Sequence, residues 1–248
     1  MLDSLRTPPT VSLPDASDLG NLRSEHRMAQ RSTLPSNMVT GIGVVCFILG
    51  TLFGGGMLIW MGLAFIAVGV GVWYSIWRLR NMRALVYDGG IVSERNGNTI
   101  KFRWDDVVDL YESVTRKSIN GIYVATEHLY TVHLKDGTEA VYGALLQNTE
   151  KIGDTIRTET WNRLMTAAID AYEAGEKVKF GYLTVSRDGV GNRKEEIPWT
   201  EVKGVQVRDG MVSVKKEGKW LSWNSTMASS IPNIHVFLTL VDRIVEVR

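Results

Sequence analysis

"FRWDDVVDLYE" (residues 102–112) and "IPWTEVKGVQV" (residues 197–207) share one pattern in two different parts of the chain. In both, an apolar residue is followed two places on by Trp, two places later by an acid, and then by Val. We interpret the recurrence as an internal duplication in which each Trp anchors a corresponding strand in its own hydrophobic core. Each acid is expected where the next strand begins. The signature residues of the repeat are Trp104, Asp106, Trp199 and Glu201.

Short strands surround both phrases. Asp-Gly and Asn-Gly steps recur through the chain and predict tight turns between alternating apolar and polar residues. Helical spacing of apolar residues follows at about 147–174 and again from about Pro232. We therefore expect an α+β protein with two units, residues 84–175 and 176–248, each made of several strands closed by one helix.

A long apolar stretch precedes the first unit. No Asp, Glu, Lys or Arg occurs between Arg31 and Arg78, and this run is roughly twice the 20 or so residues that one membrane-spanning helix needs. The glycines at 54–56 break the run and favour a tight turn. The sequence predicts a transmembrane hairpin with helices at 38–53 and 57–77, because a soluble protein would need a very large core to cover it.

Arginines flank the predicted hairpin on both sides. By the positive-inside rule, both ends of the chain are expected in the cytoplasm, which makes this a multi-pass protein of the cell membrane with two spans. Residues 1–37 are rich in Pro, Ser and Thr and are predicted to form a flexible cytoplasmic tail. Glycines in the spans are expected to serve close helix packing. The flanking arginines are Arg23, Arg27 and Arg31 before the hairpin and Arg78, Arg80 and Arg83 after it.

Five stretches carry a resemblance to a known fold. They are "VYDGGIV" (86–92), "FRWDDV" (102–107), "FGYLTVSRDGV" (180–190), "IPWTEV" (197–202) and "IPNIHVFLTLV" (231–241). An antiparallel, partly open β-barrel closed by a C-terminal helix resembles the pleckstrin-homology-like (PH-like) fold. An N-terminal transmembrane two-helix hairpin followed by two PH-like units resembles a bacterial membrane-anchored family of unknown function. The resemblance implies peptide or lipid binding, and it leaves open whether the units are separate barrels or share a sheet.

Catalytic and cofactor chemistry has little support in the sequence. The single cysteine, Cys46, lies in the apolar stretch, and the four histidines lie at no metal-ligand spacing. Asp105 and Asp106 are adjacent, so on a strand they face opposite sides and do not share a substrate. We expect no enzymatic activity and no cofactor or metal site. The net charge of +1 gives no reason to expect a nucleic-acid partner.

The two predicted units differ in charge. Residues 84–175 carry 14 acids and 9 bases, whereas residues 176–248 carry 9 acids and 12 bases. The basic side of the second unit is an ordinary solvated face, a site for anionic lipid headgroups, or a surface that docks on the acidic first unit. Trp220 and Trp223 are either core residues or anchors for a partner. The candidate lipid or partner contacts are Arg78, Arg80, Arg83, Lys194, Lys215, Lys216 and Lys219.

The leading functional hypothesis is a membrane-anchored interaction or scaffold protein. It would be integral to the lipid bilayer, would present its PH-like units at the cytoplasmic face and would bind a protein partner there. The alternative is recognition of anionic lipid headgroups by the basic second unit. The two hypotheses differ in salt dependence, because attraction to headgroups through exposed lysines is screened over about 8 Å at physiological ionic strength.

Overall fold

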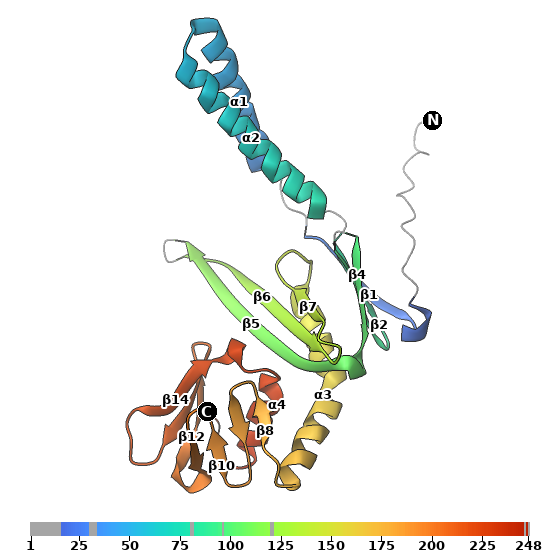
Figure 1. Ribbon diagram of the computed structural model, residues 1–248, viewed down its shortest axis with the longest axis vertical. Coiled ribbons are helices and arrows are strands. Elements are labelled where there is room, and N and C mark those ends of the chain that lie inside the picture. Colours follow the sequence, from blue (N-terminus) through green and yellow to red (C-terminus); the bar gives the residue numbers. More distant parts are fainter. Residues whose placement is uncertain are drawn as a thin grey trace.

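Two units and a helical pair make up the computed structural model, which describes residues 16–29, 34–79, 82–95, 97–119, 122–245 and 247. Unit 1 contains a four-stranded antiparallel sheet in the order β1-β2-β3-β4, a three-stranded antiparallel sheet in the order β5-β6-β7, and a long helix, α3 (Figure 1). Its elements are β1 (Leu22–Arg27), β2 (Arg83–Tyr87), β3 (Gly90–Arg95), β4 (Asn98–Arg103), β5 (Val107–Ile119), β6 (Ile122–Leu134), β7 (Glu139–Tyr142) and α3 (Thr149–Glu173).

Unit 2 follows the same order of elements. A four-stranded sheet, β8-β9-β10-β11, is followed by a three-stranded sheet, β12-β13-β14, and then by helix α4. In both units a one-turn 3-10 helix joins the two sheets, η2 (Trp104–Asp106) and η3 (Trp199–Glu201). The strands and helix of unit 2 are β8 (Val178–Phe180), β9 (Leu183–Val185), β10 (Gly189–Gly191), β11 (Glu196–Pro198), β12 (Val202–Arg208), β13 (Met211–Lys216), β14 (Ser222–Met227) and α4 (Ile234–Asp242).

The tryptophan at the start of each 3-10 helix is held in the same way. The backbone N–H of Trp104 donates to the carbonyl of Gly89 and that of Trp199 to the carbonyl of Asp188, both at 3.1 Å. Each indole Nε1 also donates to a backbone carbonyl at 2.8 Å, that of Asp88 for Trp104 and that of Ser186 for Trp199. The acid of each phrase, Asp106 or Glu201, ends the 3-10 helix just before the next strand.

Each unit has its own hydrophobic core, and α3 contributes to both. Ile152 and Ile156 of α3 are fully buried with the strands of unit 1, whereas Met165 and Ala168, three turns further on, belong to the core of unit 2. One helix therefore joins the two cores. Other buried members of the first core include Val86, Ile91, Leu110, Val132 and Tyr142, and those of the second include Leu183, Val205, Val214, Phe237 and Leu240.

Part of the expected flexible tail belongs to the fold. Residues 17–19 form a short 3-10 helix whose Leu19 is 1% exposed, and β1 then pairs antiparallel with β2. His26 on β1 is buried, and its Nδ1 lies 3.1 Å from the carbonyl oxygen of Gln147, just before α3. The expectation of a flexible tail is therefore wrong for residues 16–29. The sequence did not reveal β1 because it is a mostly polar edge strand without a clear apolar alternation. Residues 1–15 and 30–33 lie outside the described part.

Two apolar helices, α1 (Leu34–Phe53) and α2 (Gly56–Leu79), pack side by side and project from unit 1 (Figure 1). Glycines form the contact. A Cβ on Gly43 would lie 2.9 Å from the carbonyl oxygen of Gly62, and a Cβ on Gly62 would lie 2.6 Å from the backbone nitrogen of Phe47. The expected role of glycines in close helix packing is confirmed at these positions.

The prediction of two membrane spans is wrong. Among the described residues, one helix is long and apolar enough to cross a membrane, Gly56–Trp77 with 22 residues. The apolar part of α1, Asn37–Phe53, covers only about 25 Å at roughly 1.5 Å per residue, short of a hydrocarbon core of about 30 Å. The uncharged run thus does not divide into two full spans. The predicted two-pass topology with both termini in the cytoplasm is overturned by the same finding.

The predicted architecture of the rest of the chain also needs correction. We expected a transmembrane hairpin followed by two partly open barrels, each with a C-terminal helix. The described residues form four small antiparallel sheets instead, two in each unit, within an α+β protein. Alternation along strands identifies which face is buried, but it does not decide whether neighbouring meanders close into one barrel.

Candidate functional site

The turn between β13 and β14 is the most exposed apolar feature of unit 2. Gly218 adopts a positive φ of 67° after β13 ends, which allows the chain to reverse before β14. At this turn Trp220 is 88% exposed and Leu221 61% exposed. Tryptophan is usually well buried in a monomeric protein, so an indole presented to solvent at the tip of a hairpin is a candidate contact for a partner.

Lysines flank this turn, and part of their charge is already paired. The ammonium group of Lys215 donates to Ser222 Oγ at 2.9 Å, and that of Lys216 lies 2.5 Å from Glu201 Oε2. Lys219 is exposed beside Trp220. We call Lys215, Lys219, Trp220 and Leu221 the Trp220 turn. Its charge is positive and its tip is apolar, a combination that suits both protein and lipid contacts.

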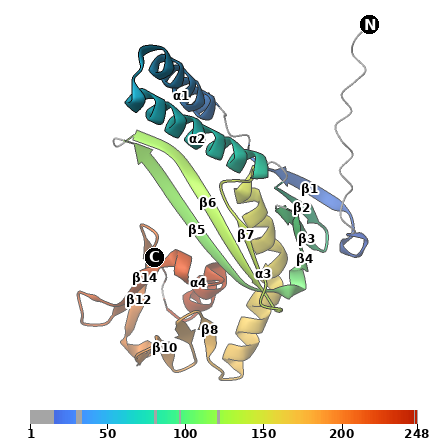
Figure 2. The same cartoon turned by 45° about the horizontal axis from the view of Figure 1, so that its top comes forward.

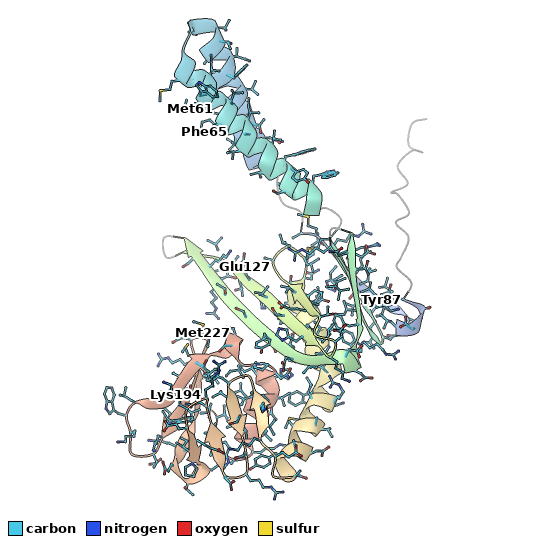
Figure 3. The ribbon with its side chains drawn as sticks, viewed as in Figure 1. Met61, Phe65, Tyr87, Glu127, Lys194 and Met227 are labelled. Atoms are coloured by element: carbon cyan, nitrogen blue, oxygen red, sulfur yellow. The ribbon has the colours of Figure 1, made fainter. Side chains whose placement is uncertain are left out.

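The turn between β10 and β11 lies beside the start of β14. Trp223 Nε1 donates to Glu195 Oε1 at 2.6 Å, and the indole packs partly buried against the core of unit 2. Lys194, next to Glu195, is exposed and marks this turn in Figure 3. Of the two tryptophans that the sequence left open, Trp220 is therefore the exposed one and Trp223 is a packing residue.

The predicted basic contacts do not form one cluster. Arg83 lies on β2 of unit 1, and its guanidinium binds Glu94, with Nε 2.6 Å from Oε2. This pairing raises the pKa of Arg83 and leaves its side chain only 13% exposed. The side chain of Arg78 and all of Arg80 lie outside the described residues. Lys194, Lys215, Lys216 and Lys219 belong to unit 2, whereas Arg83 belongs to unit 1.

The repeat signature residues are structural. Trp104 is 7% exposed and packs edge-on against Phe102. Asp106 Oδ2 accepts a hydrogen bond from the backbone N–H of Arg103 at 3.1 Å and so closes the 3-10 turn. Trp199 packs against the second core, and Glu201 pairs with Lys216. These residues hold the junction between the two sheets of each unit.

The joint between the two units was not predicted. Asn233, immediately before α4, binds the edge of β5 through four hydrogen bonds. Its Oδ1 accepts from Leu110 N at 2.9 Å, and its backbone N–H donates to the Leu110 carbonyl at 2.8 Å. Its Nδ2 donates to the Val108 carbonyl at 2.9 Å and, more weakly, to Asp109 Oδ1 at 3.4 Å. Asn233 has a φ of 50°, a left-handed conformation that asparagine tolerates better than most residues. No periodicity in the sequence signals such a contact.

A charged cluster lies beside this joint. Arg157 Nη2 of α3 is 2.5 Å from Glu112 Oε2 on β5, and His235 Nδ1 of α4 is 3.4 Å from Glu112 Oε1. The side chain of His235 is 13% exposed, and neither of its buried ring nitrogens has a hydrogen-bond partner of good geometry among the described residues. Burial raises the pKa of Glu112, but His235 and Arg157 outweigh it, and the net effect lowers that pKa. The cluster holds three elements together and presents no open site.

No group of three or more His, Cys, Asp or Glu side chains in the described ranges is arranged to hold a metal ion.

Comparison with known proteins places residues 12–248 in one family. No curated protein matches the sequence. A family of unknown function, DUF6585, matches residues 12–248, which include β1, the helical pair and both units. The chain therefore belongs to the DUF6585 family.

Proposed function

We propose that this protein is a non-enzymatic interaction module that α2 holds at a membrane. The observation that carries the proposal is the uncovered apolar surface of the helical pair. Phe53 and Met57 near the turn are 79% and 84% exposed, and Trp60 and Val68 of α2 are 74% and 59% exposed. A soluble monomer rarely leaves so large a contiguous apolar surface in water, and a lipid bilayer covers it without any specific partner.

The polar groups within the helical pair support the same conclusion. Ser75 Oγ donates to the Gly71 carbonyl at 2.9 Å, and Thr51 Oγ1 donates to the Ile48 carbonyl at 2.7 Å, so each hydroxyl is satisfied by its own helix. Neither helix carries an Asp, Glu, Lys, Arg or His residue from Met38 to Trp77. In this proposal α2 is the segment that anchors the chain in the membrane, and α1 packs along it through the glycine contacts.

The two units supply the interaction surface. Unit 2, which contains the Trp220 turn, lies at the end of the molecule away from α1 and α2 in both views (Figures 1 and 2). An exposed Trp next to Leu is a natural anchor for a protein partner. The matching order of elements in the two units supports the view that they are repeats of one PH-like module, and we include that relationship in the proposal.

The membrane proposal predicts that charge on the outer face of α2 abolishes anchoring. Val68 and Val70 are 59% and 53% exposed in the middle of α2. A lysine at the centre of a span costs about 2.5–3.5 kcal/mol on insertion scales, so Val68→Lys with Val70→Lys should move the chain from the floating to the soluble fraction in a sucrose-gradient flotation assay. The matched control is Val108→Lys with Val141→Lys, on exposed strand positions of unit 1, which should float like the wild type. Flotation of the α2 variant would contradict the proposal.

Anionic lipid recognition by unit 2 is the alternative function. It is favoured by the exposure of Lys194, Lys219 and Trp220, and it is weakened by the pairing of Lys216 with Glu201. Chain reconstituted in neutral vesicles would then recruit a second population of anionic vesicles at low salt and release it at about 0.5 M salt, where screening is strong. Lack of recruitment at low salt would leave a protein partner as the ligand of the Trp220 turn.

A further inference from the structure

Strand β6 has a neighbour along only part of one of its two edges. The first edge pairs with β5 along the length of the strand, but β7 pairs with the second edge only from Tyr130 to His133. In unit 2 the matching strand, β13, pairs with β14 from Met211 to Lys215 and so has a neighbour along almost its whole length. We call residues 125–129 of β6 the open edge, because no second described strand pairs with β6 there; Glu127 marks it in Figure 3.

The additional length of the β5–β6 hairpin is not needed to build the core. Strands β5 and β6 have 13 residues each, whereas β12 and β13, in the same places of unit 2, have seven and six. The buried core residues of the longer hairpin all lie near its base, and the open edge contributes none to the described cores. These core residues are Val107 and Leu110 of β5 and Tyr130, Val132 and Leu134 of β6. The extension therefore has a purpose other than packing.

The backbone groups that face the open edge follow from the pairing at the end of β6. The backbone N–H of Leu134 donates to the carbonyl of Thr138, on the side of β7, at 2.9 Å. Successive residues of a regular strand direct their backbone groups to opposite edges, and the pairing of β6 with β5 is regular over residues 125–133. Counting back from Leu134 in steps of two, the N–H and C=O groups of Thr126 and His128 face the open edge.

The two edges of the hairpin differ in how well they are protected against an added strand. Strand β5 has exposed Arg116 and Lys117, and its pairing becomes irregular after Lys117. Charged side chains and irregular pairing are common devices that discourage edge pairing. Residues 125–129 of β6 include no proline, lysine or arginine, and their one acid, Glu127, forms an ion pair with Lys117 at 2.7 Å. A regular edge of this kind is a template for an extended chain.

We propose that the open edge of β6 binds an extended segment of a partner protein as an additional antiparallel strand, in line with β7. One face of the added strand would lie beside Leu129 and Val141, which are 45% and 38% exposed. The other face would lie beside His128 and Thr126, and Thr126 pairs with exposed Arg116 of β5. A segment that alternates apolar residues toward Leu129 with acids toward Arg116 therefore suits both faces.

A second copy of this chain is a poorer occupant of the open edge. Two copies would pair these edges about a two-fold axis perpendicular to the strands. The arrangement that pairs Thr126 of one copy with His128 of the other uses the backbone groups on both edges. It also places Glu127 directly opposite its own copy, and like charges in this position are destabilising. The charge pattern thus favours a different protein.

A phage-displayed library of random peptides, screened against the full chain in detergent, tests the inference. We expect the enriched peptides to alternate apolar and acidic residues. A bound peptide should slow amide exchange at Thr126 and His128 by about tenfold or more, while Glu127 and Leu129, whose amides face β5, should change little. Thr126→Pro removes one N–H from the open edge and should weaken binding by roughly tenfold, about the value of one hydrogen bond. Thr126→Val retains the N–H and should bind like the wild type.

The outcomes separate this inference from the proposed function, on whose interaction role it rests. If no peptide is enriched, or if the enriched peptides slow exchange only at the Trp220 turn, the inference is wrong and the Trp220 turn remains the proposed contact. Equal slowing at Thr126 and Glu127 would contradict binding at the open edge without use of any variant. Concentration-dependent protection of Thr126 in the chain alone would assign the edge to a second copy and overturn the inference. Flotation reports anchoring independently of all these results.

Discussion

Replacing Gly189 by Ala should unfold unit 2. A Cβ at this position would lie 2.0 Å from the carbonyl oxygen of Ile197 and 2.7 Å from its carbonyl carbon. These are backbone atoms of the paired strand, β11, and no side-chain rotation relieves the collision. Overpacking a well-packed site typically costs about 1–3 kcal/mol, and a backbone clash of this size lies at or above the upper end. The strands β8 to β11 have only three residues each, so this sheet has few other contacts to offset the collision. The variant should therefore lose the cooperative unfolding transition of unit 2.

Gly90 provides an internal repetition of the same test, and Gly143 provides the control. A Cβ on Gly90 would lie 2.0 Å from the Phe102 carbonyl oxygen, the matching position in unit 1. A Cβ on Gly143 meets only the end of the Leu129 side chain, at 2.9 Å. Thermal unfolding followed by circular dichroism in detergent should show a large decrease in the midpoint temperature for Gly189→Ala and Gly90→Ala. Gly143→Ala should remain close to the wild type. If Gly189→Ala unfolds at the same midpoint temperature as Gly143→Ala and the wild type, the β10–β11 pairing is incorrect.

Replacing Asn233 by Ala should separate the two units. The change removes the side-chain groups that bind Leu110 N and the Val108 carbonyl, and it leaves the buried amide of Leu110 without a partner. An unsatisfied buried donor costs about 1–3 kcal/mol, and a left-handed conformation costs Ala a further 1–2 kcal/mol or so. We expect a total loss of about 3 kcal/mol in the free energy of unfolding. Amide hydrogen exchange at Leu110 should increase by roughly two orders of magnitude.

Two glycine variants separate the contact from the backbone conformation. Asn233→Gly keeps the left-handed conformation at no steric cost, keeps the backbone hydrogen bond to the Leu110 carbonyl and loses only the side-chain hydrogen bonds. It should therefore show most of the exchange effect at Leu110 with a smaller loss of stability. Asn148 has the same conformation before α3, with a φ of 52°, but its side chain makes no capping hydrogen bond. Asn148→Gly should therefore be close to neutral. If Leu110 exchanges at the wild-type rate in Asn233→Gly, the joint does not depend on this side chain.

Several features of the fold follow from local patterns in the sequence. Asp106 and Glu201, the acids of the two tryptophan phrases, lie directly before β5 and β12, where a strand was expected to begin. The expected helices at about 147–174 and from about Pro232 correspond to α3 and α4. The break at glycines 54–56 falls between α1 and α2. Each of these depends on spacing within a short window, where periodicity and turn residues are informative.

The features that could not be predicted depend on distant contacts or on small differences in length. The apolar part of α1 is shorter than a membrane span because of where the helix and its apolar residues begin, which composition alone does not give. The buried His26 and the contact of Asn233 with Leu110 join residues more than 100 positions apart. The exposure of Tyr123 and Val124 on β6 was not recognised because these are ordinary strand residues in type, and only the end of β7 shows that this part of β6 lacks a third strand.

The most direct test of the account is alkaline carbonate extraction of membranes that contain the wild-type chain. Carbonate removes proteins held at a membrane surface by charge, but it does not remove a helix that crosses the hydrocarbon core. Because the apolar stretch of α2, Gly56–Trp77, has 22 residues and contains no Asp, Glu, Lys or Arg, the account predicts that the chain stays in the membrane pellet. Release of the wild-type chain into the supernatant would contradict membrane anchoring by α2.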